Sequence, residues 1–222
     1  LVTPRSPLKK VAKAVAYPLL LKVFDAVLYV GSINRDYYLH YRYPKERMFF
    51  SPHAVDNEHF SSGATKVNGR AVREGLGLSQ STFVVLFVGR LVEFKHPQHV
   101  VEVVAALRKK EIDAVAVFAG SGALNEELLR RAISLDVPVH LLGLVNQSKL
   151  PATYAAADVL MLPSTGHETW GLVCNEALAA RTPILVADTV GCSRDLAIDG
   201  VAGRTYPFAD VGTAVDRLTQ IV

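Results

Sequence analysis

Residues 82–110 read TFVVLFVGRLVEFKHPQHVVEVVAALRKK, and this stretch decides the fold class. Its first seven residues form an unbroken apolar, β-branched run, which is typical of a strand buried on both faces of a sheet. A loop follows over residues 89–96, and Pro97 then opens a segment with apolar residues at helical spacing. A strand, a loop and a helix in this order form the repeating unit of a parallel α/β sheet.

The same order recurs toward the end of the chain. Further strands are expected at residues 114–119, 138–142, 158–162 and 183–187. Helices are expected at residues 97–110, 125–135, 147–157 and 169–180, with two more starting near Ser193 and near Asp210. No strand is assigned to residues 203–206. The fold class is therefore α/β, with a Rossmann-like parallel sheet flanked by helices.

The first 60 residues do not share this spacing. They predict a helix over residues 9–24, a strand over 26–31, a second helix over 32–41 and an extended segment over 47–52. So few elements cannot close a sheet alone. We therefore expect residues 1–60 to be the end of an N-terminal domain, 61–68 a linker, and 69–222 a domain whose last helix is cut short.

Composition places the chain among globular proteins, because 50% of its 222 residues are hydrophobic and 20% are charged. Its two cysteines, Cys174 and Cys192, cannot build a disulfide framework or a zinc site, so a reducing, cytoplasmic location is expected. No signal peptide and no transmembrane span is expected, because charges and Pro18 interrupt the most apolar stretch.

Positive charge is concentrated at the start of the chain. Residues 1–50 carry a net charge of +6 and residues 51–222 one of −3. Apolar residues recur at near-helical spacing through the basic stretch, at Leu8, Val11, Val15, Leu19 and Val23. Three readings stay open: a solvated basic helix, packing against another domain, or contact with an anionic membrane surface at the cytoplasmic face.

Ligands of parallel α/β sheets bind beyond the carboxyl ends of the strands, so the loops at that edge deserve inspection. The loop after the first predicted strand carries two permanent cations five residues apart, Arg90 and Lys95. Two cations suit a diphosphate, although ordinary surface charge is an equal alternative on this evidence alone.

The loop after the fourth predicted strand leads into a helix with Gly171 in its first turn. Free backbone N–H groups at a helix start form an anion site. Glu168 lies at the mouth of this helix and Glu176 follows eight residues later, about 12 Å along a helix axis. This span fits a sugar and a ribose separated by two phosphates. Alternatively, the two carboxylates are a helix-start acid and a surface residue.

These residues resemble a known family. The segment ETWGLVCNEALA (168–179), preceded by LPS, is similar to the signature of retaining GT-B glycosyltransferases of the large nucleotide-sugar-dependent family, glycosyl transferases group 1. FVGRLVEFKHP (87–97), FAGSG (118–122) and TPILVAD (182–188) resemble other segments of its C-terminal, donor-binding domain. FDAVLYVGS (24–32) and FFSPHAVDNEHF (49–60) resemble the end of its N-terminal domain.

The resemblance implies transfer of a sugar from a nucleotide diphosphate to an acceptor hydroxyl, with the anomeric configuration retained. The implied catalytic residues are Arg90 and Lys95, on the diphosphate, and Glu168, on the donor sugar. Glu176 would hold the ribose, and backbone near Leu144 and Val145 would meet the base. The remaining implied donor-binding residues are Gly89, Ser121, Thr169, Trp170, Gly171 and Leu172. This chain would be the donor-binding part, inactive alone.

The sequence departs from the family pattern in one place. Where the family commonly has Gly-Gly-x-x-Glu, this chain has Gly191-Cys192-Ser193-Arg194-Asp195, so a side chain at Cys192 would narrow a close backbone approach. No cofactor and no metal are expected, because the chain contains no Asp-x-Asp. The expected partners are the nucleotide sugar and an acceptor, lipid-linked or a growing glycan, with no nucleic acid.

The sequence is compatible with features of two other function classes. A dinucleotide-dependent oxidoreductase is suggested by Gly120-Ser121-Gly122 after a strand, but the third glycine of that fingerprint falls on Asn125. A non-catalytic module that binds a nucleotide or a partner remains the alternative.

Overall fold

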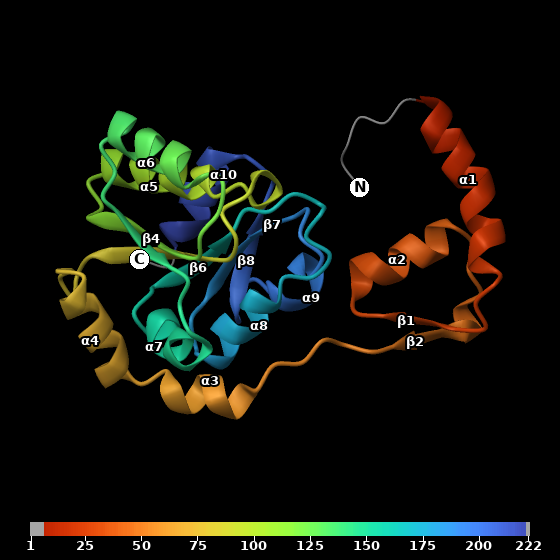
Figure 1. The fold of residues 1–222 in the computed structure, drawn as a ribbon, viewed down its shortest axis with the longest axis horizontal. Coiled ribbons are helices and arrows are strands. Elements are labelled where there is room, and N and C mark those ends of the chain that lie inside the picture. The colour runs from red at the N-terminus through yellow and green to blue at the C-terminus, as the bar shows by residue number, and fades with distance from the viewer. Residues whose placement is uncertain (1–6, 221–222) are drawn as a thin grey trace.

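The computed structural model describes residues 7–220, and the side chains of residues 13–220. It consists of an N-terminal unit, residues 7–56, and a larger C-terminal body, residues 57–220. Figure 1 shows the two parts joined by an extended segment between β2 and α3.

The C-terminal body is built on a six-stranded parallel sheet of order β5-β4-β3-β6-β7-β8. Its strands are β3 (Phe83–Val88), β4 (Ala114–Ala119), β5 (Val139–Gly143), β6 (Val159–Leu162), β7 (Ile184–Ala187) and β8 (Gly203–Tyr206). This confirms the predicted fold class and all five predicted strands. β8 was missed, because its sequence, GRTY, lacks an apolar run.

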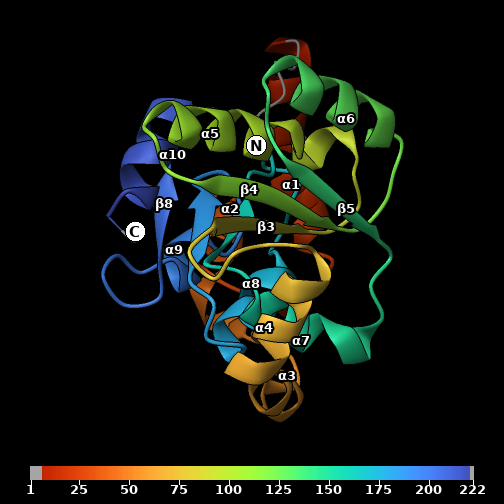
Figure 2. The ribbon, with the colours of Figure 1, turned by 90° about the vertical axis from the view of Figure 1, so that its left-hand side faces the viewer.

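Helices cover both faces of this sheet (Figure 2), which explains why β3 and β4 are buried at every position. One face carries α5 (Gln98–Lys109), α6 (Asn125–Ser134) and α10 (Val211–Leu218). The other carries α3 (Asn57–Gly63), α4 (Lys66–Gly75), α7 (Leu150–Ala155) and α8 (Leu172–Ala179). The short helix α9 (Ser193–Leu196) follows β7.

Chain direction across the sheet reverses at β3. The chain runs outward through β4 and β5, returns to pair β6 with β3, and continues outward through β7 and β8. In open α/β sheets ligands bind at such a switch point, beyond the carboxyl ends of the strands. The loops after β3 and β6 therefore flank the crevice where a ligand is expected.

The N-terminal unit contains α1 (Pro7–Leu21), β1 (Val27–Tyr29), α2 (Ser32–His40) and β2 (Met48–Phe50), with a 3₁₀ turn at Lys45–Arg47. β1 and β2 pair in parallel. The two predicted helices, the strand and the extended segment are confirmed, within a few residues at their ends.

The predicted linker, residues 61–68, is mostly helical, because α3 and α4 span most of it. Asp56 and Thr65 accept the capping hydrogen bonds of these two helices. α3 packs on α7 and α8, and α4 packs on α7. The boundary at residue 69 stays a prediction, but it falls within α4, and both α3 and α4 pack on the C-terminal body.

Polar contacts join the two parts at the start of α2. The Asp195 carboxylate accepts hydrogen bonds from the Ser32 backbone N–H at 2.9 Å and from the Ser32 hydroxyl at 2.6 Å. Arg194 pairs with Asp36 at 2.9 Å. Asp195 thereby satisfies a free N–H of the first turn of α2, and its negative charge suits that helix end.

The basic helix for which a membrane contact was one of three open interpretations corresponds to α1, where Val15 and Leu19 are more than half exposed. The side chains of Leu8 and Val11 lie outside the described residues. Among residues 7–220, no helix combines the length and the apolarity needed to cross a bilayer. Membrane contact by α1 stays a prediction.

A buried histidine makes stability depend on pH. His99 is 2% exposed and stacks on the Tyr206 ring, with centroids 5.7 Å apart. Burial lowers the pKa of His99 from its ordinary value of 6.5, and Glu102 offsets part of that effect. Between the lowered pKa and 6.5 the unfolded chain binds more protons, so stability falls as pH falls through this window.

We expect the free energy of unfolding of the wild-type chain to fall more steeply between pH 7.5 and pH 5 than that of His99→Phe. The difference in slope should not exceed about 1.4 kcal/mol per pH unit. Urea titrations at both pH values measure it. Parallel pH dependences would contradict a neutral buried imidazole.

Candidate functional site

The loops after β3 and β6 meet beyond the carboxyl ends of their strands. The Thr165 backbone N–H donates to the Phe94 carbonyl at 2.8 Å, which ties the two loops together. β3 and β6 are neighbours in the sheet, so this contact lies at the switch point. The two loops that the sequence analysis singled out, which begin and end a stretch of about 80 residues, therefore form one surface.

At this junction Lys95 forms an ion pair with Glu168. The Lys95 ammonium contacts Glu168 Oε2, and the two side chains are 14% and 15% exposed. The fully buried Ser164 hydroxyl lies 3.4 Å from the same carboxylate oxygen. The structure thus brings together two of the predicted charged residues, Lys95 and Glu168. They are partly shielded from water, and charge–charge interactions are stronger there than in bulk solvent.

Arg90 is exposed. Gly89, the preceding residue and a predicted donor-binding residue, adopts a φ of 146°. The positive φ at Gly89 is accessible to glycine with little strain and turns the chain sharply at the end of β3. The structure therefore leaves Arg90 on the surface near the carboxyl end of β3, while Lys95 lies in the ion pair.

The loop after β4 lies directly against the loop after β3. The Leu91 N–H donates to the Ser121 carbonyl at 3.0 Å, and a Cβ at Gly120 would collide with the Gly89 carbonyl. The Gly120-Ser121-Gly122 turn therefore allows close packing of two backbones. It places Ser121, half-buried, beside the loop that carries the two cations.

Helix α8 starts at Leu172, three residues later than predicted. Gly171 precedes it with a φ of 101°, and no side chain caps the helix. Glu168 and Thr169 therefore belong to the loop, and the axial spacing of about 12 Å expected for Glu168 and Glu176 does not apply. The uncapped start of α8 retains the backbone N–H groups of an anion site.

Glu176 lies on α8 and is held by a residue that the sequence did not single out. The Tyr154 hydroxyl donates to Glu176 Oε2 at 2.6 Å. Burial raises the pKa of Glu176, and the hydrogen bond from Tyr154 acts in the opposite direction. The two residues are 22 positions apart in the sequence, which explains why no local pattern links them.

The Trp170 side chain contacts Asn175 of α8 and residues of the N-terminal unit. It is 6% exposed, and its indole N–H donates to Asn175 Oδ1 at 2.8 Å. Its ring lies against Gly31 and makes an edge contact with the His53 ring, with ring centroids 6.1 Å apart. A donor contact by Trp170 can therefore involve its backbone, whereas its side chain packs between the C-terminal body and the N-terminal unit.

Cys192 does not project into the crevice. Its side chain is fully buried, as is that of Cys174. The hydrogen bond between the two thiols, and then burial, raise the pKa of Cys174. Gly191 retains the close approach, since a Cβ there would collide with the Thr169 carbonyl. The narrowing expected from the Cys192 side chain is therefore not seen at this position.

In the loop after β5, Leu144 is 84% exposed, while Val145 packs partly on the core.

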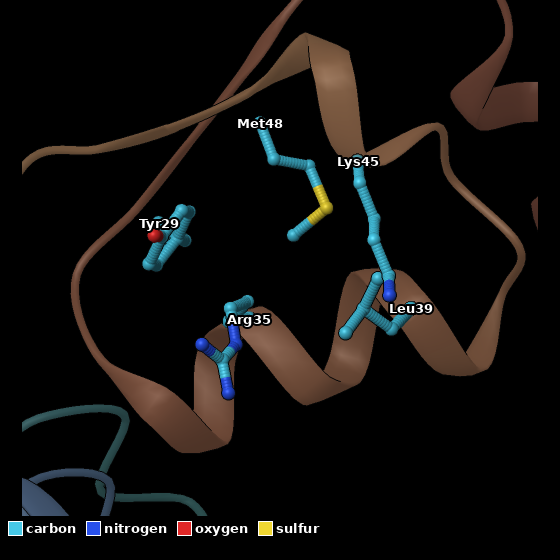
Figure 3. Close-up of a pocket in the computed structure, with 5 residues that line it drawn as sticks. All are labelled: Tyr29, Arg35, Leu39, Lys45 and Met48. Atoms are coloured by element: carbon cyan, nitrogen blue, oxygen red, sulfur yellow. The ribbon is translucent and has the colours of Figure 1, made fainter.

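A separate pocket of about 350 Å³ lies in the N-terminal unit (Figure 3). Its lining residues are Tyr29, Arg35, Leu39, Lys45 and Met48, none of which belongs to the loops described above. Within residues 7–220, no cluster of three His, Cys, Asp or Glu side chains could hold a metal ion.

Comparison with known proteins supports the resemblance. The family model described as Glycosyl transferases group 1 matches residues 70–222. A D-inositol 3-phosphate glycosyltransferase of Corynebacterium aurimucosum is 31% identical over 197 residues, covering 85% of this chain and 46% of the relative. One of Mycobacterium leprae is 34% identical over 171 residues, covering 76% of this chain and 39% of the relative. The chain thus spans less than half the length of these relatives.

Solved structures share the fold. Anabaena HepE in complex with UDP and glucose superimposes with a TM-score of 0.78 at 19% identity, covering 97% of this chain and 58% of HepE. A sucrose-phosphate synthase from Thermosynechococcus elongatus gives a TM-score of 0.73 at 22% identity, covering 97% of this chain and 54% of the synthase. The N-terminal unit is included in both superpositions, because they cover nearly the whole chain.

The ion pair predicts a non-additive effect on stability. Lys95→Met leaves a mostly buried carboxylate without its cation and should lower the free energy of unfolding by about 2–3 kcal/mol. The double variant Lys95→Met/Glu168→Gln should recover most of this loss. Urea titrations give all the values.

The matched control is Lys110→Met, which removes the cation of the exposed Lys110–Asp216 pair and should cost less than about 1 kcal/mol. If Lys95→Met and the double variant lose equal free energy of unfolding, Lys95 and Glu168 are not coupled.

Proposed function

The chain belongs to the glycosyl transferases group 1 family, and from this premise we propose that it binds the nucleotide diphosphate sugar of a glycosyl transfer. In the proposed reaction the sugar moves to an acceptor hydroxyl with retention of its anomeric configuration. The observation that carries the proposal is the Lys95–Glu168 ion pair at the switch point of the sheet.

The charges in the crevice suit this ligand. Negative charge accumulates on the diphosphate as the bond to the sugar breaks, and fixed cations beside it lower the energy of that state. Lys95 and Arg90 are the proposed cations. The uncapped start of α8 adds backbone N–H groups and the positive end of a helix dipole.

The two carboxylates suit the two sugars of the ligand. Each ionised carboxylate has about four acceptor positions and can take hydrogen bonds from paired hydroxyls. We assign Glu168 to the donor sugar, because it lies beside Lys95, and Glu176 to the ribose. The backbone near Leu144 and Val145 then meets the base, with Ser121 beside the nucleoside.

The UDP and glucose named for HepE support this class of ligand, and UDP is therefore the first nucleotide to test. The rest of the proposal concerns the reaction around the ligand. Transfer needs no metal ion, and this chain alone binds donor without turning it over. The acceptor is lipid-linked or a growing glycan, and α1 is the candidate for a peripheral membrane contact.

The decisive test is nucleotide binding by Glu176→Gln. The substitution removes a charged acceptor, so the affinity for the tightest of UDP, GDP and ADP should fall by about 1.5–3 kcal/mol, at least about tenfold. Isothermal titration calorimetry measures it. Glu74→Gln, at an exposed position of α4, is the control and should bind like the wild type. Failure of the wild-type chain to bind any of the three would refute the proposal.

The diphosphate assignment is tested with Arg90→Met. Removing one charge should weaken UDP binding about fivefold to tenfold and leave the weaker binding of uridine unchanged, because uridine carries no phosphate. The exposed Arg130→Met on α6 serves as control. Equal losses for UDP and uridine would place Arg90 away from the phosphates.

A further inference from the structure

Tyr154 has a buried hydroxyl that makes a hydrogen bond to Glu176. Its side chain is fully buried on α7, and its hydroxyl donates to Glu176 Oε2 at 2.6 Å. Hydrogen bonds from a hydroxyl to an ionised carboxylate are short and strong. The bond occupies one oxygen of Glu176 and leaves the other free for a ligand.

The tyrosine itself is held on two sides. Its ring packs against Phe60 of α3 in an edge contact, with centroids 5.9 Å apart at 68°. Its backbone carbonyl accepts a hydrogen bond from the Thr182 hydroxyl at 2.8 Å. Three elements, α3, α7 and the segment before β7, therefore fix the position of the hydroxyl.

Glu176 needs such a support. A glutamate on a helix surface has three rotatable bonds, and its rotamer freedom is among the largest of any side chain. Two neighbouring ribose hydroxyls require one particular orientation of the carboxylate. A carboxylate already held in that orientation loses less freedom on binding, which raises affinity without a new contact to the ligand.

We propose that Tyr154 is the positioning residue for Glu176 and sets how strongly this chain prefers a ribose with free hydroxyls. The inference rests on the proposed function, because it takes Glu176 as the ribose contact. Tyr154 does not touch the ligand. It acts through the orientation of the Glu176 carboxylate, which lies between Tyr154 and the ligand.

Electrostatics around the pair agree with this arrangement. The pKa of Tyr154 is raised, first by burial and then by the negative charge of Glu176, so the hydroxyl keeps its proton and remains a donor. Burial raises the pKa of Glu176, and the hydrogen bond from Tyr154 offsets part of that rise.

The test compares a nucleotide with its counterpart that lacks both ribose hydroxyls. The affinities of UDP and 2′,3′-dideoxyuridine diphosphate are measured by calorimetry for the wild-type chain, Tyr154→Phe, Glu176→Gln and Tyr206→Phe. If GDP or ADP binds more tightly than UDP, that nucleotide and its dideoxy counterpart replace the pair. The quantity compared between variants is the affinity ratio, which is the affinity for the nucleotide divided by the affinity for its dideoxy counterpart.

Tyr206→Phe is the matched control, because Tyr206 is a second buried tyrosine, 1% exposed. Its hydroxyl has no hydrogen-bond partner among the described residues. Tyr154→Phe should lower the affinity ratio about fivefold to tenfold, through weaker UDP binding and unchanged binding of the dideoxy compound. Tyr206→Phe should leave the ratio unchanged. A merely structural role of Tyr154 would weaken both ligands alike.

The outcomes separate this inference from the proposed function. If Glu176→Gln lowers the ratio and Tyr154→Phe does not, the positioning role is wrong and the proposed function stands. If neither variant lowers the ratio, Glu176 is not the ribose contact and the inference falls with that assignment. If the wild-type chain binds none of the three nucleotides, both the proposed function and the inference are refuted.

Discussion

The site depends on one constraint: β3 is hydrogen-bonded along both of its edges, to β4 and to β6, with all three strands parallel. Strands that pair in parallel deliver their following loops to the same edge of the sheet. Because β3 and β6 are neighbours, the loop that carries Lys95 meets the loop that carries Glu168. A different strand order would leave these residues far apart, whatever their local sequence.

Backbone contacts then fix the loops at this edge. Loops that follow adjacent strands are joined by hydrogen bonds such as Thr165 N–H to the Phe94 carbonyl at 2.8 Å and Gly191 N–H to the Glu168 carbonyl at 3.0 Å. Glycines allow the close approaches, as at Gly120 and Gly191, where a Cβ would collide with a neighbouring carbonyl. The side chains of the site therefore stand on a rigid base, which is what recognition of a polar ligand requires.

Each carboxylate of the site has a partner, and the two partners differ in charge. Glu168 is paired with a cation, Lys95, whereas Glu176 receives a hydrogen bond from the neutral Tyr154. Partial burial makes an unpaired charge costly, and each partner offsets part of that cost. A cation can also turn toward a bound phosphate, while a buried tyrosine held by its neighbours cannot. The two ends of the site are thus suited to different parts of one ligand.

The α/β class, the strands β3 to β7 and the charged residues of the two loops can all be predicted from the sequence. Apolar runs, helical spacing and the family motif are local signals, so they can be read without a structure. The sequence could not show that GRTY (203–206) is a strand or that most of residues 61–68 are helical, because these segments gain their conformation by packing on neighbours. Tertiary structure alone decided the partners of the site. Lys95 with Glu168 and Tyr154 with Glu176 are joined by strand order and helix packing, and residues so far apart in sequence leave no local pattern.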